Sequence, residues 1–306
     1  MSPKDALTAP LLILMAAVLW GTAGTAQAFA PVGATPLAVG LVRLSVGGIS
    51  MLAVAMLTRS FTPSVAWDPW AVLRSVFSLA AFQPLFFIGL SRTGVAVGTV
   101  VAIGSAPIFA GLLGWAVRHE RPGGAWLTAT VLAIIGCALL LLNPQDVTVD
   151  PLGVVSALGA GFAYAAYTVF SKALLLRHKP YAVVAVVFCL SAMFLIPLAA
   201  GSDFTWIMTR QGVAVSLHLG LVTASLAYML FSRGLVYTPS ATAVTLTLAE
   251  PLTAGMLGVL VLKERITWLT ALGIFLLVVG LLVLLRSACR EAARIQRVEI
   301  DINTEV

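Results

Sequence analysis

Long, continuously apolar runs separated by short polar segments extend along the whole chain. Each run contains about 20 residues, the length that an α-helix needs to cross the hydrocarbon core of a bilayer. Polar residues do not recur at every second position within the runs, which excludes the strands of a membrane β-barrel. The pattern predicts ten membrane-spanning helices, at roughly residues 9–30, 36–58, 70–90, 94–117, 124–142, 151–175, 181–200, 211–232, 238–262 and 267–285.

Composition places the chain in the same class. Of its 306 residues, 60% are AVILMFWYC and only 10% are charged, against roughly 25% charged residues in a soluble domain. The mean hydropathy is +1.04. Ordinary soluble enzymes, disordered proteins and soluble DNA-binding domains are therefore excluded. Ala26-Gln27-Ala28 resembles a signal-peptide cleavage site, but nine further spans follow, so we expect the first span to remain in the protein.

Basic residues fall mainly on one side of this predicted topology. With a cytoplasmic N-terminus, thirteen lie inside, and the four outside are Arg92, Arg210, Lys263 and Arg265. The inside set is Lys4, Arg59, Arg74, Arg118, Arg121, Lys172, Arg177, Lys179, Arg233, Arg286, Arg290, Arg294 and Arg297. The positive-inside rule then predicts that both termini are cytoplasmic, with a basic tail at 286–306. The net charge of +6 is therefore explained by the orientation of the chain in the membrane, and it does not indicate nucleic-acid binding.

The sequence contains no motif for metal, nucleotide or nucleophilic chemistry. Cys137, Cys189 and Cys289 are scattered and lack the spacing of a metal site. The phosphate-binding loop, the H-E-x-x-H metalloprotease motif and the G-x-S-x-G nucleophile motif are all missing from the sequence. We therefore expect no metal, no cofactor and no enzymatic activity. An intramembrane enzyme is the alternative from another functional class, and the oligomeric state stays open.

The two halves of the chain repeat each other. The stretch P-I-F-A-G-L-L-G begins at Pro107, its partner P-L-T-A-G-M-L-G begins at Pro251, and a glutamate and an arginine follow both at the same spacing. Because each half holds five spans, an odd number, the halves would insert with opposite orientation. We predict two inverted repeats, 1–145 and 146–285, with a substrate site near the membrane midplane between them.

The doubled pattern Pro-x-x-Ala-x-x-x-Gly, followed by glutamate at the helix end, resembles the EamA type of the drug/metabolite transporter superfamily. Trp20-Gly21 in the first span and Arg43 in the second belong to this resemblance, which covers about residues 9–285. The chain as a whole also resembles the YddG-type aromatic amino-acid exporters of bacterial inner membranes. The resemblance implies a multi-pass inner-membrane protein that exports small organic metabolites by alternating access, without nucleotide hydrolysis.

Glu250 and Arg43 are the charged candidates for a substrate site, because ionisable groups inside a membrane are costly and commonly functional. Glu250 lies roughly 16 Å into its span, close to the midplane, and directly precedes Pro251. Its carboxyl group either faces a cavity or bonds the backbone that the proline loosens. Arg43 lies nearer the outer surface, and three roles stay open for it: reaching the headgroups, binding a substrate carboxylate, or pairing internally.

Four further candidates come in two pairs that the repeat makes equivalent. Trp20 aligns with Tyr164 at an offset of 144, and Gln83 aligns with Tyr228 at an offset of 145. Tryptophan and tyrosine can stack on a flat substrate and each offer one hydrogen bond. Their alternative role is ordinary aromatic filling between helices. Together with Glu250, these four residues are the predicted substrate-binding set.

Pro107 and Pro251 are candidate hinges in equivalent spans. Proline deletes one backbone hydrogen bond, and nearby glycines leave little side chain to resist bending. In an inverted repeat, one hinge would serve the inside gate and the other the outside gate. The alternative is a pair of static kinks that only shape the cavity.

The sequence thus predicts an all-α secondary transporter that exports small metabolites, with amino acids, and aromatic ones in particular, as the expected substrates. A broad-specificity drug or cation effluxer is the alternative within transport. The expected partners are a small-molecule substrate and the lipid bilayer. Spans 124–142 and 267–285 carry almost no polar side chains, so we place them at the periphery of the bundle.

Overall fold

The computed structural model describes residues 3–141, 150–261 and 267–304, and every regular element within them is helical. The elements are α1 (Pro3–Ala28), α2 (Pro36–Leu57), α3 (Pro69–Thr93), α4 (Val95–Arg118), α5 (Gly124–Leu141), α6 (Pro151–Leu175), α7 (Pro180–Ala199), the 3₁₀-helix η1 (Thr205–Met208), α8 (Arg210–Leu217), the π-helix η2 (His218–Leu226), α9 (Ala227–Tyr237), α10 (Ser240–Leu246), α11 (Ala249–Val261) and α12 (Trp268–Thr304).

Eight helical segments in the described parts are long and apolar enough to cross a membrane. One of them, Arg210–Tyr237, combines α8, η2 and α9, and the shorter apolar helix Gly124–Leu139 accompanies the eight. The all-helical membrane class is therefore confirmed. Each predicted span falls on helical structure, but the expectation of one unbroken helix over 238–262 is wrong, because α10 and α11 are separate.

Several helices begin with the same short sequence, a capping side chain followed by proline. Asp68 accepts hydrogen bonds from the N–H groups of Trp70 (2.9 Å) and Ala71 (3.2 Å) at the start of α3. Asp150 accepts equivalent bonds from the first turn of α6. Proline at the first helical position costs nothing, because its missing N–H would have had no partner there. These pairs fix where the helices begin.

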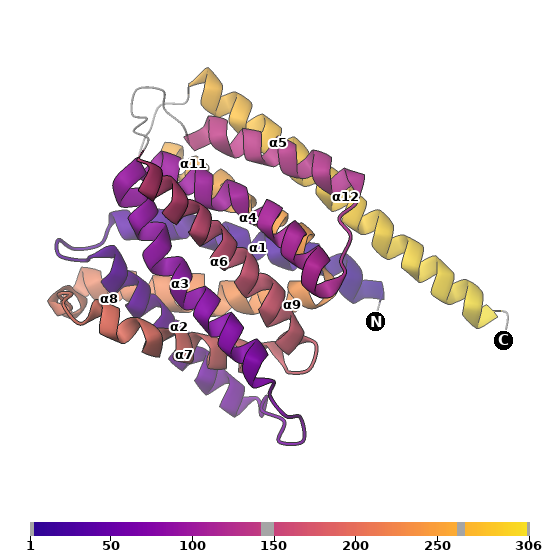
Figure 1. The fold of residues 1–306 in the computed structure, drawn as a ribbon, viewed down its shortest axis with the longest axis horizontal. Helices are drawn as coiled ribbons and strands as arrows, with labels where there is room; N and C mark the ends of the chain where they lie inside the picture. Colours follow the sequence, from indigo (N-terminus) through magenta and orange to yellow (C-terminus); the bar gives the residue numbers. More distant parts are fainter. Residues whose placement is uncertain (1–2, 142–149, 262–266, 305–306) are drawn as a thin grey trace.

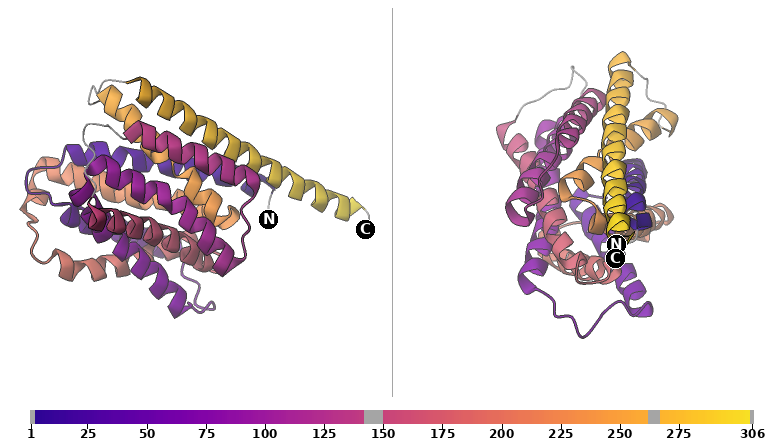
Figure 2. Two further views of the ribbon diagram at one scale, coloured as in Figure 1. Left: turned by 45° about the horizontal axis from the view of Figure 1, so that its top comes forward. Right: turned by 90° about the vertical axis from the view of Figure 1, so that its right-hand side faces the viewer.

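The helices form one bundle with α5 and α12 side by side along one edge (Figures 1 and 2). The two pack so closely that a Cβ atom on Gly136 would lie 2.6 Å from the backbone nitrogen of Leu277. This edge position agrees with the lack of polar side chains on both helices. Figure 1 also shows α12 continuing past the bundle, on the side where α1 begins, so the predicted tail at 286–306 is helical through Thr304.

Inside the bundle, α6 packs against α3 and α4, α2 against α7, and α1 against both α9 and α11. The largest cluster of buried side chains joins Trp20 on α1 with Tyr167 on α6 and Phe231 on α9. The first and second halves of the chain therefore meet along α1, α6 and α9. The candidate site lies at this junction.

Candidate substrate-binding site

Aromatic rings from α1, α6 and α9 meet in the interior of the bundle. The centroid of the Trp20 ring lies 4.7 Å from that of Tyr228 and 6.4 Å from that of Tyr164, both with edge-on geometry. Tyr228 also contacts Phe188 at 4.7 Å and Tyr167 at 5.9 Å. Edge-on contacts between aromatic rings are favourable because the positive edge of one ring meets the negative face of another. Three of the four repeat-related candidates are thus brought together.

One backbone carbonyl ties this cluster to Arg43. The oxygen of Thr223, in the π-helix, accepts a hydrogen bond from Nε1 of Trp20 (2.8 Å) and another from Nη2 of Arg43 (3.2 Å). A π-helical turn is rare and is often found at functional sites. The side chain of Arg43 therefore points into the protein. It does not reach toward the lipid headgroups, which was one of the three roles left open for it.

Glu250 begins α11 beside the same cluster. The neighbouring α1 approaches so closely that a Cβ atom on Gly21 would lie 2.8 Å from the Glu250 carbonyl oxygen, which explains why glycine follows Trp20. Among the described residues, no hydrogen bond or ion pair holds the partly buried carboxyl group of Glu250. Arg43 is nonetheless close enough for its charge to act on Glu250, and the charge of Glu250 acts on Tyr164 and Tyr228.

A break in the backbone places Glu250 there. Pro251 has no N–H for the carbonyl of Thr247, four residues earlier, and its ring clashes with that carbonyl in a regular helix. The Thr247 carbonyl instead accepts the N–H of Glu250 at 2.9 Å, and α10 ends at Leu246. The carboxyl group therefore lies in the first turn of a new helix and not in the middle of a continuous one.

Two candidates have less obvious partners. The hydroxyl of Tyr164 is buried and makes no hydrogen bond within the described parts. The hydroxyl of Thr247 lies nearby and donates to the carbonyl of Val244 (2.7 Å). Gln83 is buried against Gly40 on α2, one turn before Arg43. No ring contact joins Gln83 to the aromatic cluster in the described structure.

A second polar cluster lies at the end of the bundle where α4 and α6 finish. Oε1 of Glu120 pairs with Nζ of Lys172 (2.8 Å) and Nε of Arg118 (3.1 Å), and its Oε2 accepts the N–H of Ser240 (2.6 Å). Nζ of Lys172 also donates to the carbonyl of Thr238 at 2.7 Å. Burial raises the pKa of Glu120, but Lys172, Ser240 and Arg118 outweigh it, so the net shift is downward.

Sequence reasoning missed this cluster and part of the aromatic one. Lys172 is one of the thirteen basic residues expected on the inside, and the structure shows it as a buried residue of α6 with Glu120 as its partner. The repeated motif that includes Glu120 was a usable signal for its importance. Tyr167, one turn after Tyr164, could have been found from its spacing. Nothing in the sequence pointed to the Thr223 carbonyl, because its role depends on the π-helix.

The profile of the EamA-like transporter family matches this chain twice, over residues 7–142 and 151–286. The chain belongs to this family. It is 49% identical to the uncharacterized transporter YwfM of Bacillus subtilis strain 168, over 90% of this chain and 92% of that protein. It is 28% identical to the threonine/homoserine exporter RhtA of Escherichia coli K12, over 84% of this chain and 85% of that protein. A multi-pass transporter of the bacterial inner membrane is thereby confirmed.

A solved crystal structure shares the fold, with a TM-score of 0.80 over 92% of this chain and 98% of the other, at 21% identity. At this identity the likeness concerns the helix arrangement alone. The two matched stretches of the family profile fit the two-repeat architecture that the sequence predicts. The substrate of this family member has to be argued from its interior residues.

Proposed function

We propose that this EamA family member exports amino acids by alternating access. The observation that carries the proposal is the placement of Arg43 and Glu250, two groups of opposite charge, beside the interior cluster of Trp20, Tyr164 and Tyr228. An amino acid carries a carboxylate and an ammonium group a short distance apart. Arg43 would bind the carboxylate and Glu250 the ammonium group.

The side-chain part of the substrate would contact the aromatic rings. Trp20, Tyr164 and Tyr228 offer flat apolar faces, and the hydroxyl of Tyr164 still lacks a partner among the described residues. Aromatic amino acids and hydroxy amino acids are both suited to such a surface. The relative named for threonine and homoserine export supports the amino-acid class.

For the membrane arrangement, we propose ten spans in two inverted repeats of five, 1–145 and 146–285, with both termini cytoplasmic. The eight long apolar helices, the shorter α5 and the α10–α11 pair supply ten passes between them. The helix α1 begins and α12 ends at the same side of the bundle, which agrees with an even number of membrane passes (Figure 1). Cysteines at Asp146 and Lys179, in a background without native cysteines, should react with an impermeant maleimide from outside and inside respectively. Reaction of both from one side would contradict this arrangement.

The Glu120 cluster supports the alternating-access part of the proposal. It joins the end of α4 and the end of α6 to the turn before α10, which closes the side of the bundle that we assign to the cytoplasm. The pair at the opposite end, Arg92 with Asp150, is 47% and 35% exposed. We therefore interpret the structure as closed toward the cytoplasm, with the Glu120 cluster as the closed gate.

Countertransport into proteoliposomes tests the proposal. Vesicles preloaded with an unlabelled amino acid should exchange it for radiolabelled phenylalanine, tryptophan, threonine or homoserine from outside. An imposed pH gradient distinguishes proton-coupled transport from exchange. Exchange of organic cations but not of amino acids would instead identify a drug effluxer, and conversion of any substrate into a new product would overturn the transport proposal altogether.

A further inference from the structure

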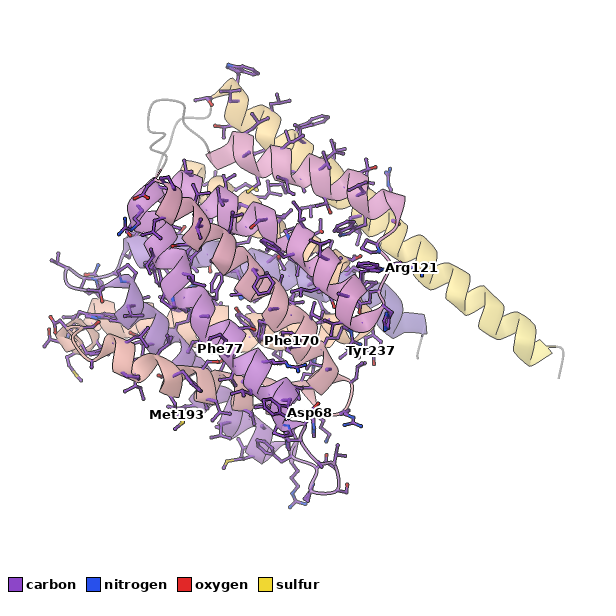
Figure 3. All side chains as sticks on the ribbon, in the orientation of Figure 1. Asp68, Phe77, Arg121, Phe170, Met193 and Tyr237 are labelled. Carbon is purple, nitrogen blue, oxygen red and sulfur yellow. The ribbon has the colours of Figure 1, made fainter. Side chains whose placement is uncertain are left out.

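An apolar groove of about 440 Å³ lies on the outside of the bundle between α3 and α7. Val72 and Val76 line it from α3, Val186, Leu190 and Phe194 line it from α7, and Trp67 lines it from the segment before α3. All its lining residues are apolar. The residues around it are also apolar and exposed, among them Phe77 and Met193, which are 64% and 63% exposed (Figure 3). The groove therefore opens toward the lipid.

The part of the groove lined by Trp67 adjoins a basic turn. The ring of Trp67 stacks on that of His178, with centroids 3.9 Å apart and planes 7° from parallel. His178 lies between Arg177 and Lys179, both exposed, in the turn that joins α6 to α7. The nearby carboxylate of Asp68 already accepts hydrogen bonds from the first turn of α3. This turn is consequently a place of positive charge directly beside an apolar groove.

The start of α7 offers positive charge to an anion. Lys179 caps α7 without a side-chain hydrogen bond, so the positive end of the helix dipole has no anionic side chain as its cap. His178 is only 7% exposed and its ring hydrogen-bonds the backbone of Ala66, so the imidazole is fixed in place and the positive charge of the turn comes from Arg177 and Lys179. Burial first, and then the charge of Arg177, lower the pKa of His178, so the histidine is neutral and the two flanking cations carry the charge.

We propose that the groove and the turn Arg177–Lys179 together bind one anionic phospholipid. One acyl chain lies in the groove, and the phosphate lies at the turn beside the start of α7. Measured from the start of each helix, the α3 lining reaches about 10 Å at Val76 and the α7 lining continues from about 9 Å at Val186, so together they cover the ~15 Å depth of one leaflet. The apolar lining thus contacts the acyl chain, and the basic turn contacts the phosphate. The tryptophan lies between them, at the membrane–water interface.

Native mass spectrometry of the full chain, purified in detergent and depleted of lipid, tests this site. Phosphatidylglycerol should bind as a single retained copy, at least about tenfold more tightly than phosphatidylcholine with the same chains. R177Q/K179Q should remove that preference. V186W, which fills the groove, should weaken both lipids, and F194A gives a second groove variant in case V186W does not fold. R210Q and L127W place the same changes at exposed positions elsewhere and should bind lipid as the wild type does.

Soluble glycerol phosphate is the competitor that distinguishes a headgroup site from a lipid site. It should displace phosphatidylglycerol poorly, because it has no chain for the groove. Displacement as efficient as that by the whole lipid would overturn the proposal. Equal retention of both lipids by the wild type would do the same, as would an unchanged preference in R177Q/K179Q.

Discussion

Two stretches that the internal repeat makes equivalent have different backbones. The helix α4 continues unbroken through Pro107, whereas α10 and α11 are separated by Thr247 and Leu248, just before Pro251. A proline in a helix removes one hydrogen bond in either case. Proline is therefore not sufficient to divide a helix, and the surrounding side chains have to account for the difference.

Those side chains differ in polarity. In the broken stretch, the hydroxyl of Thr247 donates to the carbonyl of Val244 (2.7 Å), and Thr245 accepts from Nε1 of Trp126 on α5 (3.0 Å). Hydroxyl groups that bond nearby carbonyls compete with regular helix geometry. At the place where the second repeat has Glu250, the first has Ala106, which is 2% exposed in an apolar cluster. At this pair of equivalent positions, the first repeat therefore packs, while the second supplies a charged residue of the site.

The largest expected effect is on transport, at this pair of equivalent positions. E250Q should lower amino-acid exchange by about 10- to 100-fold, the cost of losing a charge-assisted hydrogen bond to the substrate. A106S, at the equivalent place in the packing repeat, should exchange at nearly the wild-type rate. Both are measured in proteoliposomes at matched protein density. Wild-type exchange by E250Q would remove Glu250 from the proposed site.

The next prediction concerns the cluster that joins the end of α4 to the start of α10. K172M leaves the carboxylate of Glu120, which is 17% exposed, without its closest cation. We expect a loss of about 2–3 kcal/mol in stability, less than for a fully buried pair. Thermal unfolding in detergent measures it. Reactivity of a cysteine at Ser240 should rise in parallel, because the gate opens.

The exposed pair at the other end of α6 is the matched control. R92Q breaks the ion pair with Asp150 and should cost much less stability than K172M, since water screens it. The double variant E120Q/K172M should recover part of the loss of K172M, because no unpaired charge remains. A cost for R92Q as large as that of K172M would contradict the distinction between the two ends.

Replacing each of the two prolines by alanine tests how much each one shapes its own helix. P251A restores an N–H for the Thr247 carbonyl and should join α10 to α11, which moves Glu250 and lowers exchange several-fold. P107A adds one bond to a helix that is already continuous and should change exchange less. Side-specific cysteine labelling of both variants tests whether they favour opposite-facing states, as the repeat predicts. Identical labelling changes would contradict the idea of opposed gates.

Much of this molecule can be predicted from its sequence, and the limits are physical. Apolar runs of about 20 residues locate the helices, because a bilayer leaves few other solutions. The repeat brought Trp20, Tyr164 and Tyr228 into one candidate set. By contrast, the bond of Arg43 to the Thr223 carbonyl and the pairing of Lys172 with Glu120 connect residues 180 and 52 positions apart. Such contacts depend on how the helices pack, and no local pattern encodes them.

Acidity should weaken the Glu120 cluster in a defined range. The pKa of Glu120 is lowered in the folded protein from its ordinary value of 4.5. The ionised carboxylate therefore makes its full contribution to folding stability above its ordinary pKa, and this contribution is lost as the pH falls through the lowered pKa. The stability difference between wild type and K172M should be constant while Glu120 is ionised in both proteins. It should shrink as the pH falls, first through the pKa of Glu120 in K172M, where Lys172 no longer offsets burial, and then through the lowered pKa of the wild type. A difference that does not shrink as the pH falls would assign it to another group.

The last prediction concerns the anchoring of α10 to α5. T245V keeps the shape of the side chain but removes the acceptor for Nε1 of Trp126 and the partner of the Thr130 hydroxyl (3.1 Å). The two groups left behind are buried or partly buried, so we expect a loss of about 1–2 kcal/mol in thermal unfolding. The repeat provides its own control, because α4 already has valine at the equivalent position, Val101. V101T adds a hydroxyl that can bond a carbonyl of its own helix and should cost less than T245V. If T245V unfolds like the wild type, the threonines do not hold the broken helix in place, and Pro251 alone would have to explain why α10 ends where it does.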